Sequence, residues 1–132
     1  MARGRGAKRA IMLNVSAPFH CALMKPAQEL LAKDLEGAAI CDAQVPLANN
    51  VDAELVRTAD RLREGLKRQV TAPVRWEQAM RVLLGENVDC FIEVGPGKVL
   101  TGLLWQIDPR AECLRVEDRA TLSQVVAGLG VL

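Results

Sequence analysis

A buried strand that leads directly into a glycine-rich turn and a helix constrains the fold of this chain more than any other feature. Residues 90–94 (C-F-I-E-V) form the clearest apolar strand, and residues 95–98 (G-P-G-K) lead into a helix with apolar positions at helical spacing. A second strand is predicted at 113–116 and a last helix at 122–129. Strands that alternate with amphipathic helices indicate an α/β fold with a parallel sheet and flanking helices.

The earlier part of the chain repeats this alternation with weaker signals. Short apolar runs bounded by turn residues predict two further strands, the second weakened by an internal proline. Periodic apolar residues predict three helices, one stopped by a glycine and one opened by a proline. The predicted strands are 11–15 and 45–48, and the predicted helices are 21–35 (stopped at Gly37), 55–70 and 73–83.

Composition argues against several classes of function. The chain has 132 residues, half of them hydrophobic, which suits one domain with a real core. Aromatic residues make up only 3 % and tyrosine is absent, so a base-stacking nucleic-acid platform is not expected. Residues 1–8 are basic, and we interpret them as a solvated lead-in rather than a nucleic-acid arm. The net charge of +1 favours no class of partner.

The cysteines and the hydropathy pattern predict a cytoplasmic protein. Four cysteines are scattered without a C-x-x-C pair, so neither a zinc site nor a disulfide framework is indicated, and we interpret them as reduced thiols. No apolar run approaches the ~18 residues of a membrane span, and the first residues lack the apolar core of a signal peptide.

The only histidine, His20, lies at the corner between the predicted strand 11–15 and the helix that follows. Pro18 biases the residue before it away from helical angles, which holds the turn before the helix begins. Ligands and chemistry collect at such corners in open α/β folds, and histidine suits general acid–base work. A histidine that only packs or caps at a turn would occupy the same position, so both interpretations stay open.

The turn at 95–98 is a candidate anion site, because a glycine-rich lead into a helix exposes backbone N–H groups. It matches neither of the common nucleotide motifs. Val99 follows the lysine where a phosphate loop has Ser or Thr, and Leu100 stands where a dinucleotide loop has its third glycine. A structural turn is the favoured interpretation, with phosphate binding as the alternative.

His20 lacks a convincing nucleophile in this sequence. The two serines, Ser16 and Ser123, lie in no G-x-S-x-G elbow. Cys21 is adjacent, but neighbouring helical residues point about 100° apart, so the two side chains cannot simply pair. The chain therefore supplies a candidate base while its nucleophile is missing.

Several segments, in order along nearly the whole chain, resemble the bacterial malonyl-CoA:acyl carrier protein transacylases. The resemblance is to the carboxy-terminal part of an enzyme well over twice as long. The matching segments are G-A-K-R-A (6–10), S-A-P-F-H-C-A-L-M-K-P (16–26), N-N-V-D (49–52), R-Q (68–69), P-V-R-W (73–76) and E-V-G-P-G-K-V-L-T-G-L (93–103).

The resemblance implies roles for three residues. His20 stands where the family has the base that activates a serine. Gln69 occupies the position whose backbone carbonyl orients that histidine. Phe19 corresponds to an acyl-pocket position at which, in related polyketide acyltransferases, phenylalanine tends to accompany malonyl rather than branched units, a trend that the discrete transacylases break. The family's elbow serine, its carboxylate-binding arginine and its oxyanion-hole glutamine have no counterpart in this sequence.

The resemblance also implies a fold and an activity. Residues 1–15 would be a lead-in and a remnant strand of a small ferredoxin-like subdomain, and 16–132 would be part of the hydrolase-like acyltransferase core. The activity would be transfer of malonyl from malonyl-CoA to acyl carrier protein in fatty acid biosynthesis, with no cofactor, no nucleic acid and no membrane. The chain alone would be inactive. Two alternatives are an acyltransferase domain fragment of a polyketide synthase and a non-catalytic module that binds phosphate or a nucleotide.

Overall fold

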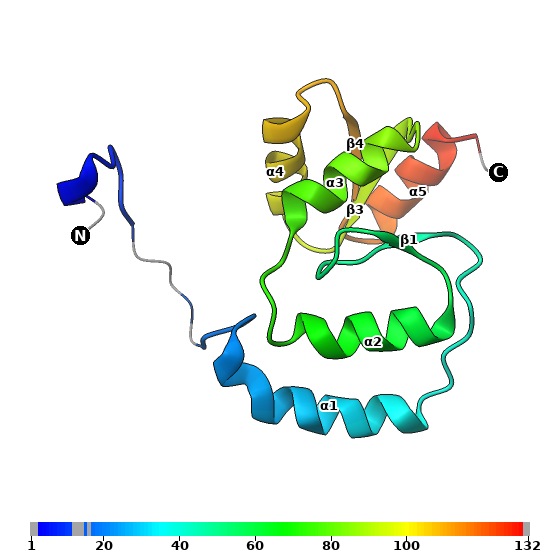
Figure 1. The fold of residues 1–132 in the computed structure, drawn as a ribbon. Helices are drawn as coiled ribbons and strands as arrows, with labels where there is room; N and C mark the ends of the chain where they lie inside the picture. Colours follow the sequence, from blue (N-terminus) through cyan, green and yellow to red (C-terminus); the bar gives the residue numbers. More distant parts are fainter. Residues whose placement is uncertain (1–2, 12–14, 16, 131–132) are drawn as a thin grey trace.

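The computed structural model describes residues 3–11, 15 and 17–130, which form five α-helices, four strands and two short 3-10 helices (Figure 1). In chain order the elements are η1 (Arg3–Arg5), η2 (Ala22–Met24), α1 (Lys25–Gly37), β1 (Leu47–Ala48), β2 (Leu55–Val56), α2 (Ala59–Gln69), α3 (Trp76–Gly85), β3 (Cys90–Val94), α4 (Val99–Ile107), β4 (Glu112–Val116) and α5 (Arg119–Gly128).

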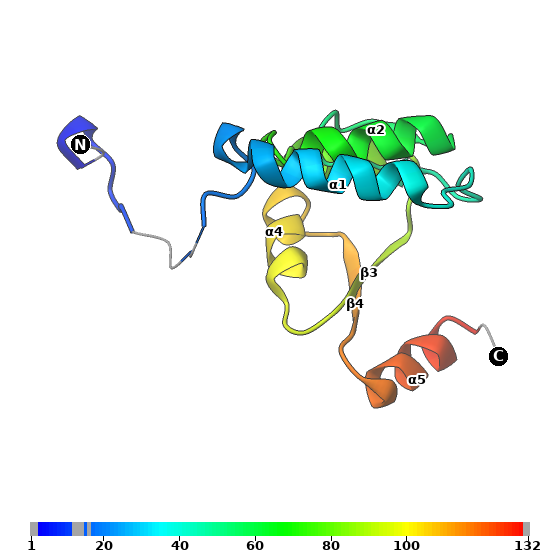
Figure 2. The ribbon, with the colours of Figure 1, turned by 90° about the horizontal axis from the view of Figure 1, so that it is seen from below.

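The carboxy-terminal part is a β-α-β unit followed by a helix. Strands β3 and β4 pair in parallel from Cys90 opposite Glu112 to Val94 opposite Val116, and α4 connects them. Helices α4 and α5 lie on either side of the strand pair (Figures 1 and 2). The parallel sheet, the strand at 90–94 and the α/β class are therefore confirmed.

The amino-terminal part pairs two helices beneath a short hairpin. Helices α1 and α2 lie side by side in both views, and β1 pairs with β2 in antiparallel fashion, with Leu47 opposite Val56 (Figures 1 and 2). The hairpin overturns part of one prediction, because Leu55 belongs to β2 and α2 begins only at Ala59.

Two other helices, α1 and α3, also begin later than predicted, and α5 begins three residues earlier than predicted. Cys21 is extended and residues 22–24 form a 3-10 turn, so α1 begins at Lys25 with Pro26 in its first turn, where proline is tolerated. Pro73 does not open α3, which begins at Trp76. The backbone N–H of Arg75 instead donates to the carbonyl of Asn50 at 2.8 Å, and this contact holds the segment before α3 in a non-helical path.

The buried core is small and the exposed apolar surface is large. Ala53, Ala79, Met80 and Leu104 form the central cluster. In contrast, Ile92 and Val94 of β3 are 43 % and 77 % exposed. Parallel strands are normally covered on both faces and are therefore apolar on both. The exposed apolar side chains of β3 are typical of a strand that lies inside a larger sheet.

Two further sequence predictions concern a strand near the amino terminus and the absence of a membrane span. The strand predicted at 11–15 lies largely outside the described residues, since 12–14 are not among them. Among the described helices, none is long and apolar enough to cross a membrane.

Candidate active site at the end of helix α2

His20 lies in a tight turn immediately before η2. The N–H of Phe19 donates to the carbonyl of Ala17 at 3.0 Å, and the thiol of Cys21 donates to the carbonyl of Pro18 at 3.1 Å. His20 itself has a φ of 56°, in the left-handed region. That conformation costs a non-glycine residue about 1–2 kcal/mol, so contacts of the ring and the turn must hold it. The side chain is exposed and therefore accessible to a reacting partner.

The imidazole contacts the carboxy-terminal end of α2. Its Nδ1 lies 2.8 Å from the backbone carbonyl oxygen of Gln69, the last residue of that helix. A carbonyl oxygen only accepts hydrogen bonds, so the neutral ring carries its hydrogen on Nδ1. Nε2 is then left with its lone pair, which is the form that a general base requires. The resemblance implied this contact, while the catalytic role of His20 stays a prediction.

The position of the contact also favours a ring that becomes charged during a reaction. The last carbonyls of a helix have no partner within the helix and carry the negative end of its dipole. Gln69 therefore offers the ring an acceptor that stabilises a transient imidazolium. No side-chain carboxylate is needed for this purpose.

A network of side chains holds the end of α2. Gln28 of α1 donates its Nε2 to the carbonyl of Lys67 at 2.8 Å, and Asn50 donates its Nδ2 to Oε1 of Gln69 at 3.3 Å. Arg68 forms a bidentate salt bridge with Asp52, in which Nη1 and Nη2 donate to Oδ1 and Oδ2 at 2.7 and 2.5 Å. Three consecutive residues at the end of the helix are thus each held by a different side chain.

Asp52 is kept ionised by its partners. Hydrogen bonds from Arg68 first, and then from Asn49, lower the pKa of Asp52 from 3.8 to about 2. A carboxyl whose pKa is lower in the folded protein stabilises the fold above its unfolded pKa. We therefore expect this contribution to be complete at neutral pH and to be lost as the pH falls from 3.8 through about 2. The difference in melting temperature between wild type and Asp52→Asn, which is small because the pair is largely exposed, should vanish over that range.

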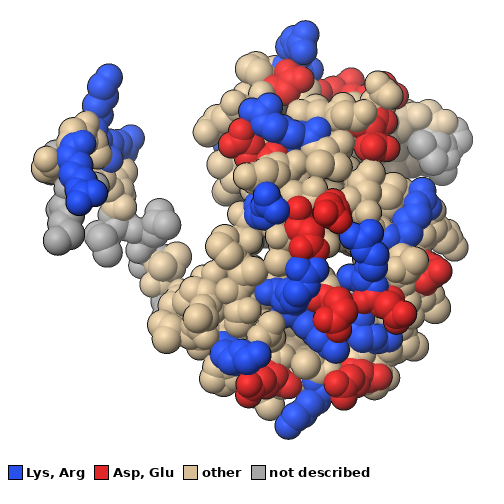
Figure 3. All heavy atoms as spheres, in the orientation of Figure 1, with Lys and Arg blue, Asp and Glu red and all other residues tan. Residues whose placement is uncertain are grey.

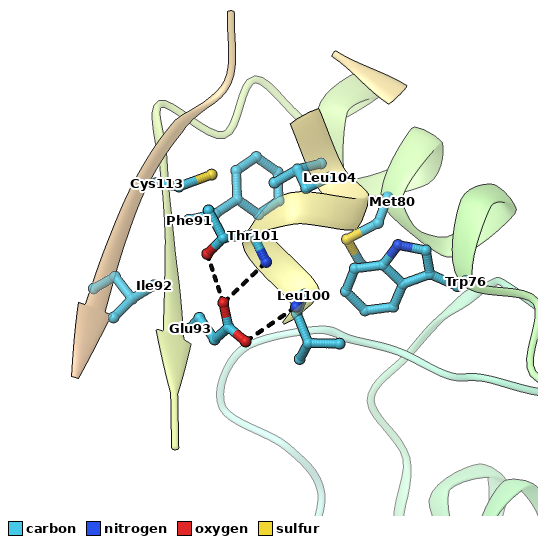
Figure 4. Close-up of a pocket in the computed structure, with 9 residues that line it drawn as sticks. All are labelled: Trp76, Met80, Phe91, Ile92, Glu93, Leu100, Thr101, Leu104 and Cys113. Atoms are coloured by element: carbon cyan, nitrogen blue, oxygen red, sulfur yellow. Dashed lines mark hydrogen bonds between the residues drawn. The ribbon is translucent and has the colours of Figure 1, made fainter. Parts of the chain in front are cut away.

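The helix start that follows the glycine turn at 95–98 is capped by the protein's own carboxylate. Glu93, near the end of β3, accepts the backbone N–H groups of Leu100 and Thr101 at 3.0 and 2.9 Å and the hydroxyl of Thr101 at 2.6 Å (Figure 4). The hydrogen bonds from Thr101 lower the pKa of Glu93. Because Glu93 already occupies two N–H groups of the first turn of α4, those of Leu100 and Thr101, the geometry argues against the phosphate-binding alternative. Gly95 and Gly97, both at positive φ, serve the turn.

Glu93→Gln should therefore destabilise α4 without affecting His20. The neutral amide loses the charge that favours the helix amino terminus and accepts with one oxygen only. We expect a melting temperature lower by a few degrees at pH 7. Because the pKa of Glu93 is lowered in the folded protein, the difference from wild type should shrink as acid protonates the wild-type carboxyl. Glu112→Gln, on the neighbouring strand, is the control. It should change neither the melting temperature at pH 7 nor its dependence on pH.

A cavity of about 170 Å³ lies between α3, α4 and β3, and its walls are mostly apolar (Figure 4). Trp76 and Met80 form one wall, and the titratable groups in its lining are Glu93 and Cys113. Both oxygens of Glu93 are engaged by α4, and burial raises the pKa of the Cys113 thiol. Neither group is set up for acid–base chemistry, so this cavity is not the reaction site.

The other predicted residues do not join His20 in one cluster. Phe19 is 58 % exposed, and its acyl-pocket role stays a prediction. Ser123 lies on α5 and donates to the carbonyl of Arg119, and α5 is far from the start of α1 in both views (Figures 1 and 2). Ser16 lies outside the described residues.

Sequence reasoning missed the supporting roles of Asp52, Arg68 and Glu93. The segment N-N-V-D and the pair R-Q drew attention only through the resemblance. A carboxylate at the end of a strand, a few residues before a helix start, was the available signal for Glu93.

Charges are mixed on the face formed by α1 and α2. Lysine and arginine side chains alternate with acidic ones there (Figure 3), and pairs such as Arg61–Glu54 at 2.6 Å and Lys67–Glu64 at 3.1 Å neutralise each other. This face therefore presents no large surface of one sign. A phosphate backbone would require such a surface.

No protein-family model matches the chain. The malonyl CoA-acyl carrier protein transacylase of Bacillus subtilis is 43 % identical over 129 residues, which cover 98 % of this chain and 41 % of the relative. The enzyme of the same name from Escherichia coli K12 is 45 % identical over 105 residues, covering 80 % of this chain and 34 % of the relative.

Solved structures give the same result. The acyl-carrier-protein S-malonyltransferase of Bartonella henselae superposes with a TM-score of 0.89 at 36 % identity, covering 98 % of this chain and 41 % of that one. A malonyl-transacylase solved with its type II polyketide acyl carrier protein gives a TM-score of 0.86 at 41 % identity, covering 96 % of this chain and 41 % of that one. Sequence and fold together identify the chain as related to the malonyl CoA-acyl carrier protein transacylases, of whose length it spans about two fifths.

Proposed function

We propose that this chain supplies the general base of a malonyl-CoA:acyl carrier protein transacylase whose nucleophilic serine lies outside these 132 residues. The observation that carries the proposal is the 2.8 Å contact between Nδ1 of His20 and the Gln69 carbonyl, which leaves Nε2 free to accept a proton. The reaction would move a malonyl group from coenzyme A to the phosphopantetheine thiol of the carrier, as in fatty acid biosynthesis.

The chemistry divides into two half-reactions that use the same ring. In the first, Nε2 takes the serine proton as the oxygen attacks the malonyl thioester, and the imidazolium returns that proton to the departing coenzyme A thiolate. In the second, Nε2 takes the proton of the carrier thiol, which attacks the malonyl-serine ester, and the serine oxygen recovers the proton as it leaves. Both are acyl transfers without net redox change, so malonyl-CoA enters as a substrate and no cofactor is proposed.

The proposal includes the finer division of the fold. Residues 1–15 would belong to a small ferredoxin-like subdomain, and 16–132 to the hydrolase-like core of a cytoplasmic enzyme. The open β3 and its exposed Val94 support a core that extends beyond the described residues. An acyltransferase fragment of a polyketide synthase would use His20 in the same way and differ in its carrier protein.

A chimera provides the test. The serine-bearing part of the Bacillus subtilis relative, up to the start of its match with this chain, is joined to residues 1–132 and assayed with malonyl-CoA and acyl carrier protein. We expect the chimera to form malonyl carrier and the 132-residue chain alone to form none above background. An inactive, folded chimera beside an active full-length relative would refute the proposal. Malonyl transfer by the chain alone would mean that a nucleophile lies within it, and Ser16 would then be the first candidate.

A further inference from the structure

We propose that Asp52 is a positioning residue for His20, acting through Arg68 and the last turn of α2. Its role is to fix the direction of the Gln69 carbonyl, and thereby the tautomer of the imidazole. The inference rests on the proposed function only for its consequence in catalysis. The positioning itself concerns the ring and can be measured without any reaction.

The Asp52–Arg68 pair orients the end of α2 and contributes little to the stability of the fold. Its side chains are 24 % and 49 % exposed, and exposed ion pairs contribute little to the free energy of unfolding. The two prongs, from Nη1 and Nη2 of Arg68 to the two carboxylate oxygens, fix the guanidinium plane as a single hydrogen bond could not. Arg68 directly precedes the residue whose carbonyl contacts His20.

The loop that carries Asp52 is itself rigidly held. Asn49 is buried and both accepts the Asp52 backbone N–H at 2.8 Å and donates to the Asp52 carboxylate at 2.9 Å. Arg75 donates to the Asp52 carbonyl at 3.1 Å. The carboxylate is therefore a fixed anchor, to which the end of α2 is attached.

The carbonyl end of a helix normally frays, and here the anchor prevents it. The Gln69 carbonyl accepts from the N–H of Ala72 at 3.4 Å as well as from His20, so a small rotation of that peptide would favour one donor over the other. Asn50, from the same loop as Asp52, holds the Gln69 side chain. Release of Arg68 would free the last turn to rotate and would weaken the Nδ1 contact.

The test reads the tautomer of the ring directly. His20 is the only histidine, so ¹⁵N-histidine labelling of the 132-residue chain gives ring-nitrogen signals from that residue alone. At a pH where the ring is neutral, we expect wild type to show one tautomer, with Nδ1 protonated and Nε2 unprotonated. Asp52→Asn and Arg68→Gln should each move both nitrogen shifts toward a mixture of tautomers, with a melting temperature close to that of wild type.

Two further variants make the result decisive. Because Asp52 acts through Arg68, the double variant should shift the signals no further than either single variant. Glu54→Gln removes another ion pair of α2, that with Arg61, and should leave the ring unchanged. A single Nδ1–H tautomer in Asp52→Asn and Arg68→Gln would overturn the inference, as would an equal shift in Glu54→Gln. If Asp52→Asn unfolds, Arg68→Lys, which keeps the charge but loses the fork, decides by the same readout.

Failure of this inference and failure of the proposed function remain distinguishable. A ring that keeps its tautomer in these variants removes the role of Asp52 and leaves His20 as the base. A ring that changes as expected, in a chimera whose transfer does not depend on His20, would instead retain the positioning and remove the function.

Discussion

His20→Ala in the chimera should lower malonyl transfer by about 10²–10⁴-fold, the usual contribution of a positioned general base. Both half-reactions should slow, because one imidazole serves the serine and the carrier thiol in turn. Malonylation of the serine and its discharge to the carrier are measured separately by rapid quench, together with the melting temperature. His20 is exposed, so its loss should leave the fold nearly unchanged. Near-normal rates, or a loss explained by unfolding, would leave the histidine with a structural role only.

Variants of Gln69 separate its backbone from its side chain. Gln69→Ala keeps the carbonyl that contacts Nδ1 and should have a small effect on the rates. Gln69→Pro reshapes the end of α2 and should approach the loss seen with His20→Ala. If the two Gln69 variants were equally impaired, the side chain rather than the carbonyl would be the important group.

The exposed apolar surface of β3 should make the isolated chain bind a hydrophobic dye or self-associate, and the chimera should do neither. Patches of this kind on soluble proteins usually mark an interface, and Ile92 and Val94 are far more exposed than is normal for a parallel strand. Dye fluorescence and light scattering of the two proteins at equal concentration provide the measurement. If the 132-residue chain were instead a compact monomer that binds no dye, it would behave as a complete domain and the expectation would be wrong.

A charge placed on β3 sharpens that comparison. Val94→Lys should be tolerated in the isolated chain, where the side chain faces solvent, and should lower the melting temperature of the chimera by many degrees, because an unpaired charge would be buried. Glu112→Lys places the same side chain on an exposed position of β4 and is the matched control. Equal effects of Val94→Lys in both proteins would mean that this face stays uncovered.

The sequence predicted the β-α-β unit well because local and global signals agree there. Residues 90–94 are apolar apart from Glu93, rich in strand formers and followed by glycines at positive φ, so strand, turn and helix boundaries are locally encoded. The hairpin of β1 and β2 was not predictable in this way. Leu55 fits the helical spacing of Ala59 and Leu62, and only its pairing with Ala48 makes it a strand residue. Two-residue strands leave no periodicity to detect.

The site was predictable only where a local sequence signal marked one of its residues. His20 stood out as the only histidine at a corner, and the resemblance alone pointed to Gln69. The pair of Asp52 and Arg68 joins residues that are 16 positions apart, and the contact of His20 with Gln69 spans 49 positions. No periodicity relates such positions, so the network could be found only in three dimensions.

Chemical rescue tests the central claim most directly. Glycine adopts the φ of 56° at position 20 without strain, so His20→Gly removes the ring while the turn can keep its shape. If His20 is the base, added imidazole should restore part of the transfer activity of the His20→Gly chimera, in proportion to the concentration of the neutral form. The same addition should leave Gln69→Pro unchanged, because its own ring is present but misplaced. An activity loss in His20→Gly that imidazole does not reverse, with the fold intact, would contradict the assignment of His20 as the general base.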